Sequence, residues 1–257
     1  MQSVIKGCDP EIFLFDSNAN KFISSIGLIG GSKSHPRPID DLGNAVQEDN
    51  VTVEFNTPPC KSSADFIKHI NKNKEWIAER AAMLGFNIAI KPSALFDDDQ
   101  LNSFEAQTFG CEPDYDAWRN GAQNPRPMAD NRNLRSCGGH IHIALEPDDD
   151  ILEVVRAMDL FVGCLMLEFD DDKDRRQLYG KAGAFRKKPY GVEYRTASNA
   201  WIKSDNLIQW AWDQTDKAVE FVRSGRTFNV YQGTMIQDCI NNSDMELLEQ
   251  LKKEFQL

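Results

Sequence analysis

The sequence lacks the features that mark membrane-spanning, secreted or disulfide-rich proteins. The longest apolar run, Leu160 to Leu167, is far shorter than the roughly 20 residues that cross a bilayer. The first residues, MQSVIKGCDPE, contain no apolar signal segment. The six cysteines are scattered without a Cys-x-x-Cys pair, which favours reduced thiols over disulfides or a cysteine-bound zinc. These absences predict a cytoplasmic protein.

Positive charge is also scarce. The chain has 29 Lys and Arg against 40 Asp and Glu, and its formal net charge is −11 at pH 7. Such a charge is unfavourable for binding along a nucleic-acid backbone or an anionic membrane, so we expect neither partner. The length of 257 residues and a hydrophobic content of 41% are typical of one large globular domain. We therefore expect a single domain over residues 1–257.

Hydrophobic periodicity predicts strands separated by long helices. Alternating or continuous apolar patterns indicate six strands, over residues 11–15, 21–26, 51–56, 86–91, 139–146 and 190–196. Amphipathic stripes indicate helices over residues 63–84, 150–167, 204–224 and 244–255, the last with a capping box of Ser243 and Glu246. Residues 96–135 are rich in Asp, Asn and Pro and are expected to form an irregular insertion. The pattern predicts an α+β fold around a mainly antiparallel sheet.

Several predicted strands carry ionisable side chains on one face and apolar side chains on the other. Alternation along a strand places these ionisable residues on the polar faces: Asp9, Glu11, Glu54, His140, His142, Glu193 and Arg195. One explanation is the solvated face of a one-sided antiparallel sheet. However, clustered like charges repel unless a cation or a bound anion compensates them. The polar faces therefore favour one shared ligand site.

The donor set leaves two metal chemistries open. Carboxylate oxygens with one imidazole suit Mg²⁺ or Mn²⁺. Two histidines two residues apart together with a glutamate can equally hold zinc and leave a position for water. The Gly138-Gly139 pair before the histidines allows a ligand or backbone to approach closely.

A basic stretch from Lys173 to Arg195 contains eight of the 29 basic residues, interrupted by glycines. Charge alone is equally consistent with a solvated loop. Arginine forks match phosphate oxygens, however, and metal-binding carboxylates beside arginines are typical of phosphoryl transfer. Gly27 to Ser34 resembles a P-loop, but Ser32 stands at the position of its second glycine. Prolines follow where the pattern requires a helix. Lys33, at the tip of that loop, remains a candidate ligand contact.

Six short motifs occur in an order that is more specific than any one of them. They are GCDPE at 7–11, QEDNV at 47–51, EFNTPP at 54–59, GGHIH at 138–142, YGKAGAFR at 179–186 and YGVEYR at 190–195. Together they resemble the phage-associated carboxylate–amine ligases of type 2, within the glutamine synthetase-like amidoligases. The resemblance extends roughly to Trp201.

The resemblance implies a curved, mainly antiparallel sheet with helices packed on one face, as in the catalytic domain of glutamine synthetase. It implies that ATP and Mg²⁺ or Mn²⁺ bind on the concave face. A substrate carboxylate would attack the γ-phosphate, and an amine would then displace phosphate from the acyl phosphate to form an amide or peptide bond. The partners would be small-molecule or peptide carboxylates and amines. For a phage-encoded chain the location would be the host cytoplasm.

The resemblance also assigns roles to particular residues. The expected metal ligands are Asp9, Glu11, Glu54, His140 and Glu193. Arg186 and Arg195 are expected to contact phosphate and to act in catalysis with His142. Lys33 and Lys181, from the two glycine-containing basic segments, are further expected ATP contacts.

Two other functions remain open at this point. A metal-dependent hydrolase would use His140, His142 and a glutamate on zinc to activate water, and would turn over without ATP. A non-catalytic nucleotide-binding protein would keep the sheet and bind ATP without forming product.

Overall fold

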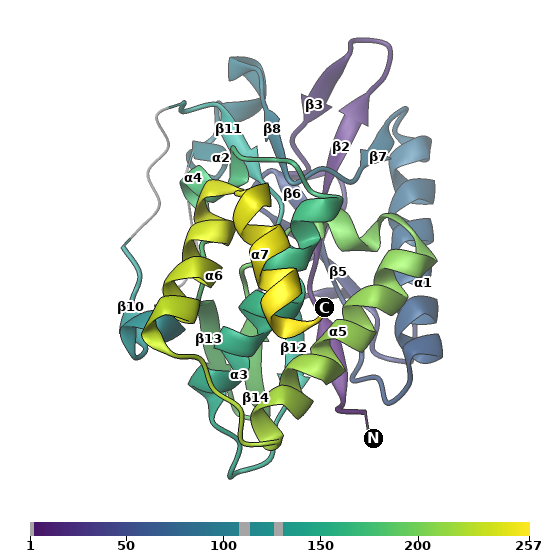
Figure 1. Cartoon of the computed structure of the whole chain (residues 1–257). Helices are drawn as coiled ribbons and strands as arrows, with labels where there is room; N and C mark the ends of the chain where they lie inside the picture. The colour runs from purple at the N-terminus through teal and green to yellow at the C-terminus, as the bar shows by residue number, and fades with distance from the viewer. Residues whose placement is uncertain (1–2, 108–113, 126–130) are drawn as a thin grey trace.

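Two antiparallel sheets form the framework of the computed structural model, which describes residues 3–107, 114–125 and 131–257. The first sheet has the order β1-β12-β14-β13-β9-β10 and the second β3-β2-β6-β5-β4, with β7 also paired to β2 (Figure 1). Strands β8 and β11 form a separate pair. The strand bounds are β1 Lys6–Cys8, β2 Glu11–Asp16, β3 Lys21–Ile23, β4 Arg37–Pro38, β5 Ala45–Asp49, β6 Thr52–Asn56, β7 Asn87–Ala89, β8 Ser93–Leu95, β9 Tyr115–Asp116, β10 Ala122–Gln123, β11 Leu134–Ser136, β12 Ile141–Ala144, β13 Ala184–Lys188 and β14 Gly191–Tyr194.

The N-terminal segment joins the two sheets. β1 pairs with β12 in the first sheet, and β2, only two residues later, pairs with β6 in the second. The backbone N–H of Glu11 donates to the Gly138 carbonyl at 2.9 Å, and the N–H of Phe55 donates to the Pro10 carbonyl at 3.2 Å. Backbone pairing therefore continues across the junction, and the expected curved, mainly antiparallel sheet is confirmed.

The longer helices cover one side of this framework. Figure 1 shows α3, α5, α6 and α7 in front of the first sheet and α1 beside the second. Their bounds are α1 Ser63–Met83, α3 Ile151–Met158, α5 Asp205–Arg223, α6 Val230–Asn242 and α7 Met245–Phe255. Single-turn helices are α2 Phe104–Gln107 and α4 Arg175–Leu178. None of the helices in the described part of the chain has the length and apolarity needed to span a membrane.

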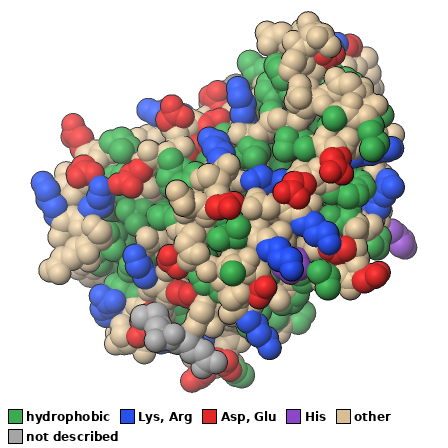
Figure 2. All heavy atoms as spheres, turned by 90° about the vertical axis from the view of Figure 1, so that its right-hand side faces the viewer, with side chains coloured by type: hydrophobic (Ala, Val, Ile, Leu, Met, Phe, Trp, Pro, Cys, Tyr) green, Lys and Arg blue, Asp and Glu red, His purple; other side chains and the backbone are tan. Residues whose placement is uncertain are grey.

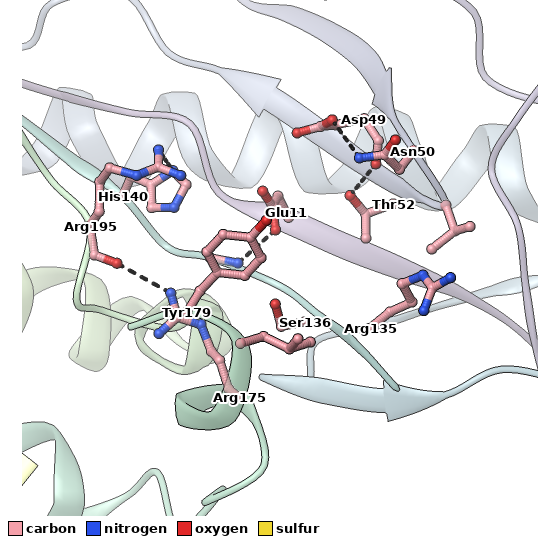
Figure 3. A pocket seen from close by; sticks show the side chains of 13 residues that line it. Glu11, Asp49, Asn50, Thr52, Arg135, Ser136, His140, Arg175, Tyr179 and Arg195 are labelled. Atoms are coloured by element: carbon pink, nitrogen blue, oxygen red, sulfur yellow. Dashed lines mark hydrogen bonds between the residues drawn. The ribbon is translucent and has the colours of Figure 1, made fainter. Parts of the chain in front are cut away.

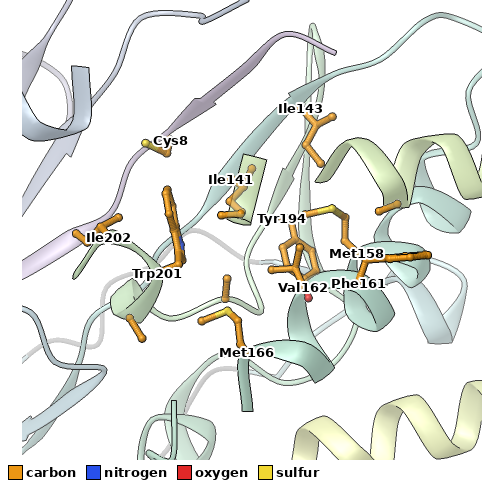
Figure 4. Packing of buried hydrophobic residues seen from close by; sticks show 14 of the residues in the cluster. Cys8, Ile141, Ile143, Met158, Phe161, Val162, Met166, Tyr194, Trp201 and Ile202 are labelled. Atoms are coloured by element: carbon orange, nitrogen blue, oxygen red, sulfur yellow. The ribbon is translucent and has the colours of Figure 1, made fainter. Parts of the chain in front are cut away.

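The core confirms the alternation expected in the central strands. Ile141 and Ile143 of β12 and Tyr194 of β14 are buried against the helices (Figure 4). Their sequence neighbours His142 and Glu193 consequently point to the opposite face of the sheet. The five described cysteines are free and buried, and Cys111 lies outside the described residues.

Two helix boundaries differ from the expectation. The helix expected from Ser243 begins after Asp244, whose carboxylate accepts from the N–H groups of Glu246 and Leu247. Ser243 has a φ of +52° and instead ends α6, a helix that the apolar pattern did not predict. The missed signal for α6 is a capping box of Asn229 and Gln232.

The helix expected over residues 150–167 is α-helical only to Met158. It continues as a π-helix, Asp159–Cys164, and a 3₁₀ turn, Leu165–Glu168. The change of helix type occurs at a charged residue that is completely buried, Asp159.

Asp159 ties the helix layer to the first sheet and to the insertion. One carboxylate oxygen accepts hydrogen bonds from Trp118 Nε1 at 2.7 Å and Gly183 N at 2.6 Å. The other accepts from the hydroxyls of Tyr194 at 2.8 Å and Thr196 at 3.1 Å. Burial raises the pKa of Asp159 to about 7 despite these donors. The carboxylate thus fixes the loop before β13 and the end of β14, which carry basic residues of the site.

Replacement of Asp159 tests this anchor. Asp159→Ala leaves the partly buried Trp118 and the buried Gly183 donors without an acceptor, and we expect it to cost on the order of 3 kcal/mol of unfolding free energy. Asp159→Asn should cost much less, because its amide oxygen can serve those two donors while its NH₂ donates to the two hydroxyl oxygens. Urea unfolding measures both. Equal losses for Ala and Asn would contradict the anchoring role.

Candidate active site

Strand register brings acids from three strands together in the second sheet. Glu11 of β2 stands opposite Glu54 of β6, and Glu54 stands opposite Gln47 of β5. Asp49, two residues along β5, shares the face of Gln47. Gln47 Nε2 donates to Glu54 Oε1 at 2.7 Å, which orients that carboxylate.

Register also aligns a charged row across the first sheet. Arg186 of β13 is opposite Glu193 of β14, Glu193 is opposite His142 of β12, and His142 is opposite Gly7 of β1. Gly7 has no side chain, so the charged row ends at His142, next to the junction that carries Asp9. The acids of one sheet therefore lie beside the charged row of the other.

Both groups line one cavity of about 200 Å³. The face of the molecule in Figure 2 shows basic and acidic side chains interleaved, with several Lys and Arg next to a histidine. The cavity is lined by Asp9, Glu11, Lys33, Pro36, Gln47, Asp49, Glu54, Asn56, His140, His142, Arg186, Lys188 and Arg195.

The first acidic cluster consists of Glu11, Asp49 and Glu54. One carboxylate oxygen from each lies within 4.8 Å of the others. Burial and the charge of Asp49 raise the pKa of Glu11 to about 8. Burial and neighbouring acids also hold the pKa of Glu54 well above its usual value, and burial raises that of Asp49. Three crowded carboxyls that resist ionisation fit a site whose charge a divalent cation would compensate.

The second cluster consists of Asp9, His142 and Glu193, whose ligand atoms also lie within 4.8 Å of one another. Burial opposes ionisation of Asp9, but His142 and His140 outweigh it and hold its pKa well below the usual value. Burial and Asp9 likewise oppose ionisation of Glu193, but Arg195 and other cations lower its pKa to about 2. These two acids are charged already, so this cluster offers two anions and an imidazole.

The two histidines have different surroundings from those expected. His140, the expected metal ligand, directs Nδ1 to Asp9 Oδ1 at 3.1 Å and lies 3.3 Å from Arg195 Nη1. Burial and Arg195 lower the pKa of His140 to about 4, so it is neutral near pH 7. Its ring occupies the space that a side chain at Gly138 would need, which explains a glycine there. His142, expected to be catalytic, is the histidine that groups with a possible ligand set.

The basic residues of β13 and β14 surround Glu193. Lys188 Nζ lies 2.6 Å from one Glu193 oxygen, and Arg186 Nη1 lies 3.6 Å from the other, to which Arg195 also donates. Three basic side chains therefore gather around one buried carboxylate at this end of the cavity, with Asp9 and Asp114 also nearby. That end suits an anionic ligand such as phosphate.

The two expected lysine contacts are placed differently. Lys33 lines the cavity, and its charge favours ionisation of Asp49. Lys181 is exposed and is not among the residues that line the cavity, although its carbonyl accepts a hydrogen bond from the Thr196 hydroxyl. The structure therefore does not bring Lys181 to the other site residues.

Sequence reasoning missed Asp49, Gln47 and Lys188. Gln47 and Asp49 stand in one of the family motifs, but the strand 45–49 was not predicted, so their shared face went unnoticed. Alternation along QED and pairing to the strand of Glu54 would have indicated both. Lys188 was counted in the basic stretch, but only the β13–β14 hairpin places it beside Glu193.

A second, smaller cavity adjoins the first. The two share Glu11, Asp49, His140 and Arg195 as a common wall. Figure 3 shows the ring of Tyr179 in the middle of the second cavity. Its other lining residues include Asn50, Thr52, Arg135, Ser136 and Arg175.

Arg175 is a buried cation at the edge of the second cavity. Its guanidinium donates to the carbonyl oxygens of Cys137 at 3.1 Å, Thr196 at 2.7 Å and Ala197 at 3.0 Å. Burial lowers its pKa to about 10, so it remains charged near pH 7. Arg175 thereby joins the segment before β12 to the segment after β14 and adds positive potential beside Glu11.

A comparison with known protein families finds one match. Residues 126–232 match the family described as "Phage phiEco32-like COOH.NH2 ligase-type 2". The family resemblance is confirmed. The matched segment includes the Gly-Gly-His-x-His strand and the β13–β14 hairpin, and excludes Asp9, Glu11 and Glu54.

Among solved structures, a cryo-EM structure of Plasmodium falciparum glutamine synthetase matches with a TM-score of 0.43 and 10% sequence identity. The match covers 85% of this chain and 52% of the synthetase, so the chain spans about half the length of that protein. No curated protein matches the sequence.

The raised pKa values predict that cation binding depends on pH. Below pH 8, Glu11 is mainly protonated in the metal-free protein, so a bound Mg²⁺ must displace its proton. At pH values below that pKa, each proton released on binding should make the apparent Mg²⁺ affinity rise about tenfold for every unit by which the pH increases. Calorimetric titrations at pH 6.5 and 8.5, in buffers of different ionisation enthalpy, measure the affinity and the proton release.

The same groups predict the pH dependence of metal-free stability. At pH 6.5–8 the folded protein holds protons that the unfolded chain has released, so its unfolding free energy should fall as pH rises. Glu11→Gln should flatten this slope.

A Mg²⁺ affinity independent of pH, without proton release, would contradict the protonated cluster.

Proposed function

We propose that the protein is an ATP- and divalent-metal-dependent carboxylate–amine ligase that forms an amide or peptide bond through an acyl phosphate. The observation that carries the proposal is the convergence of two potential cation-binding clusters and the basic residues Arg186 and Lys188 in one cavity. Phosphoryl transfer requires acidic side chains that bind metal ions and basic side chains that bind phosphates, and here separate strands bring both together.

The ligand sets fit hard divalent cations. Glu11, Asp49 and Glu54 offer only oxygen atoms, which suits Mg²⁺ or Mn²⁺ better than zinc. Asp9, Glu193 and His142 offer two carboxylates and one imidazole, which also suits Mn²⁺. When bound, the cations would draw charge from the phosphate oxygens. We assign one cation to each cluster.

The two adjoining cavities suit two substrates. Arg186 and Lys188 lie beside Glu193 at the end of the first cavity where the triphosphate would lie, and Lys33 lines the same cavity near Asp49. Arg135 and Arg175 line the second cavity, where the positive potential suits the substrate carboxylate. The substrate carboxylate and the γ-phosphate of ATP would then meet at the wall that the two cavities share.

The residues of the wall and the basic end would promote both chemical steps. In the first, a carboxylate oxygen attacks the γ-phosphorus and the bond to ADP breaks. In the second, the amine nitrogen attacks the acyl carbon, phosphate leaves and the nitrogen loses a proton. Arg186 and Arg195 would stabilise the negative charge on the transferred phosphoryl group. His142 would orient Asp9, to which its Nε2 lies 3.1 Å away.

We further propose that residues 1–257 act as one catalytic domain and that the insertion selects the substrate. Asp114 in the insertion lies 3.6 Å from Arg195 Nε, and Arg135 at its end lines the second cavity. The insertion thus supplies residues on the substrate side of the wall.

Product analysis tests the proposed activity. The protein is incubated with Mg²⁺, ATP and pooled amino acids and short peptides, and the products are examined by mass spectrometry. ADP formation that requires both a carboxylate and an amine, with a new product one water lighter than their sum, supports the ligase. Turnover of an amide or ester without ATP would support the hydrolase instead. Tight ATP binding without any product would support a non-catalytic nucleotide-binding protein.

Glu11→Gln tests the first cluster. Glutamine resembles the protonated glutamate of the metal-free protein and can still accept the hydrogen bond from Gly138 N, now 2.7 Å. We therefore expect a folded protein whose metal-dependent ATP turnover falls by roughly 100-fold or more. Glu79→Gln, on the exposed side of α1, is the matched control and should retain turnover. Near-normal turnover in Glu11→Gln would rule out its role as a ligand.

Arg186→Ala tests the basic end of the cavity. We expect kcat/KM for ATP to fall by roughly 10²–10³-fold, as is typical when a donor to developing charge is removed. Arg186→Lys should recover only part of the loss, because a lysine cannot reproduce the planar fork. Steady-state kinetics at saturating Mg²⁺ measure the effect. An unchanged kcat/KM for Arg186→Ala would contradict a phosphate contact.

A further inference from the structure

The glycine-rich loop at 27–35 is organised around the side chain of Glu48. One carboxylate oxygen accepts from the backbone N–H groups of Ile29 at 2.8 Å and Gly30 at 2.6 Å. The other accepts from Gly27 N at 2.8 Å. Converging backbone N–H groups of this kind form an anion-binding nest. Here the protein's own carboxylate fills the nest, which explains how a P-loop-like sequence serves another purpose.

The loop passes from one face of β5 to the other. Gln47 and Asp49 line the cavity, so Glu48 between them points to the opposite face, where it meets the base of the loop. Gly31 has a φ of +84° and packs so closely on β5 that an added Cβ would lie 2.5 Å from the Val46 carbonyl oxygen. The chain can cross the sheet edge there only as glycine.

The tip of the loop returns to the cavity. Ser32 and His35 pair through two backbone hydrogen bonds of 3.0 Å, with Lys33 and Ser34 between them. Lys33 is exposed, yet it lines the cavity and its charge acts on Asp49. The tip follows directly on the base of the loop, where Gly31 packs against β5, so the position of the tip follows that of the base.

We infer that Glu48 is a positioning residue, which fixes the glycine-rich loop so that Lys33 lines the cavity near Asp49. This inference rests on the proposed function only for the nature of the ligand. Glu48 itself touches no substrate, because it lies on the other face of β5. Its removal should release the loop and weaken binding of a nucleotide polyphosphate, while the two acidic clusters stay in place.

Chemical rescue provides a specific test. Glu48→Ala leaves the nest with three N–H donors and no anion, so added formate should occupy it. We expect trypsin to cleave after Lys33 at least about tenfold faster in Glu48→Ala than in the unsubstituted protein, and the Kd for ADP with Mg²⁺ to rise several-fold. Formate should reverse both changes, whereas formamide, which has no charge, should not. Arg37 is followed by Pro38, so cleavage after Lys33 is readily distinguished in the digest by mass spectrometry.

Control variants separate the inference from a general loss of folding. Glu48→Gln keeps one oxygen for Ile29 and Gly30 but presents NH₂ to Gly27, so it should give an intermediate effect. Glu79→Ala should change neither readout, and circular dichroism confirms that each variant is folded. Lys33→Ala should weaken ADP binding. The double variant, Lys33→Ala with Glu48→Ala, should bind ADP no more weakly than Lys33→Ala alone.

The outcomes are distinct. Unchanged cleavage after Lys33 in Glu48→Ala, or acceleration that formate does not reverse, overturns the inference. The inference is also overturned if Glu48→Ala is cleaved faster after Lys33 but binds ADP with unchanged affinity, while Lys33→Ala does weaken ADP binding. If the unsubstituted protein binds no ADP, the proposed function fails, while cleavage and formate rescue still decide whether Glu48 fixes the loop.

Discussion

The repulsion among buried carboxylates is the constraint on which the site depends. One carboxylate oxygen each of Glu11, Asp49 and Glu54 lies within 4.8 Å of the others, in a part of the protein that disfavours their charged forms. Such a cluster weakens a fold unless it binds protons or cations. Antiparallel pairing on both sides prevents the strands from moving apart. The charge must therefore be compensated by what enters the cavity, and this links folding to ligand binding.

The second cluster solves the same problem with the protein's own cations. Arg186, Lys188 and Arg195 surround Glu193, and His142 lies beside Asp9. The acids here are ionised without added metal, and the basic side chains line the cavity. Under the proposed function, the first cluster would depend on an added cation, whereas the basic residues around the second cluster would also meet phosphate. This asymmetry would orient the ligand, with phosphates at the β13–β14 hairpin and the second substrate toward Tyr179.

Several structural residues serve this arrangement from a distance. Asp159 is buried in a π-helix and fixes the loop before β13, while Arg175 joins the segments on either side of the central strands. Glu48 occupies the nest of the glycine-rich loop. Arg175 and Glu48 bind backbone groups, whereas Asp159 accepts hydrogen bonds from one backbone N–H and three side chains. They restrain the backbone that carries the site, whereas the site residues themselves remain available to ligands.

Local patterns in the sequence were sufficient for the strands that bear Glu11, Glu54, His142 and Glu193, because alternation assigns each residue to a face without knowledge of neighbours. They were also sufficient for most helix limits. Pairing between distant segments could not be read this way. Only the folded chain shows that Asp49 joins Glu11 and Glu54, that His142 groups with Asp9, and that Lys181 stays outside, because these outcomes depend on register and on loop paths set by long-range contacts.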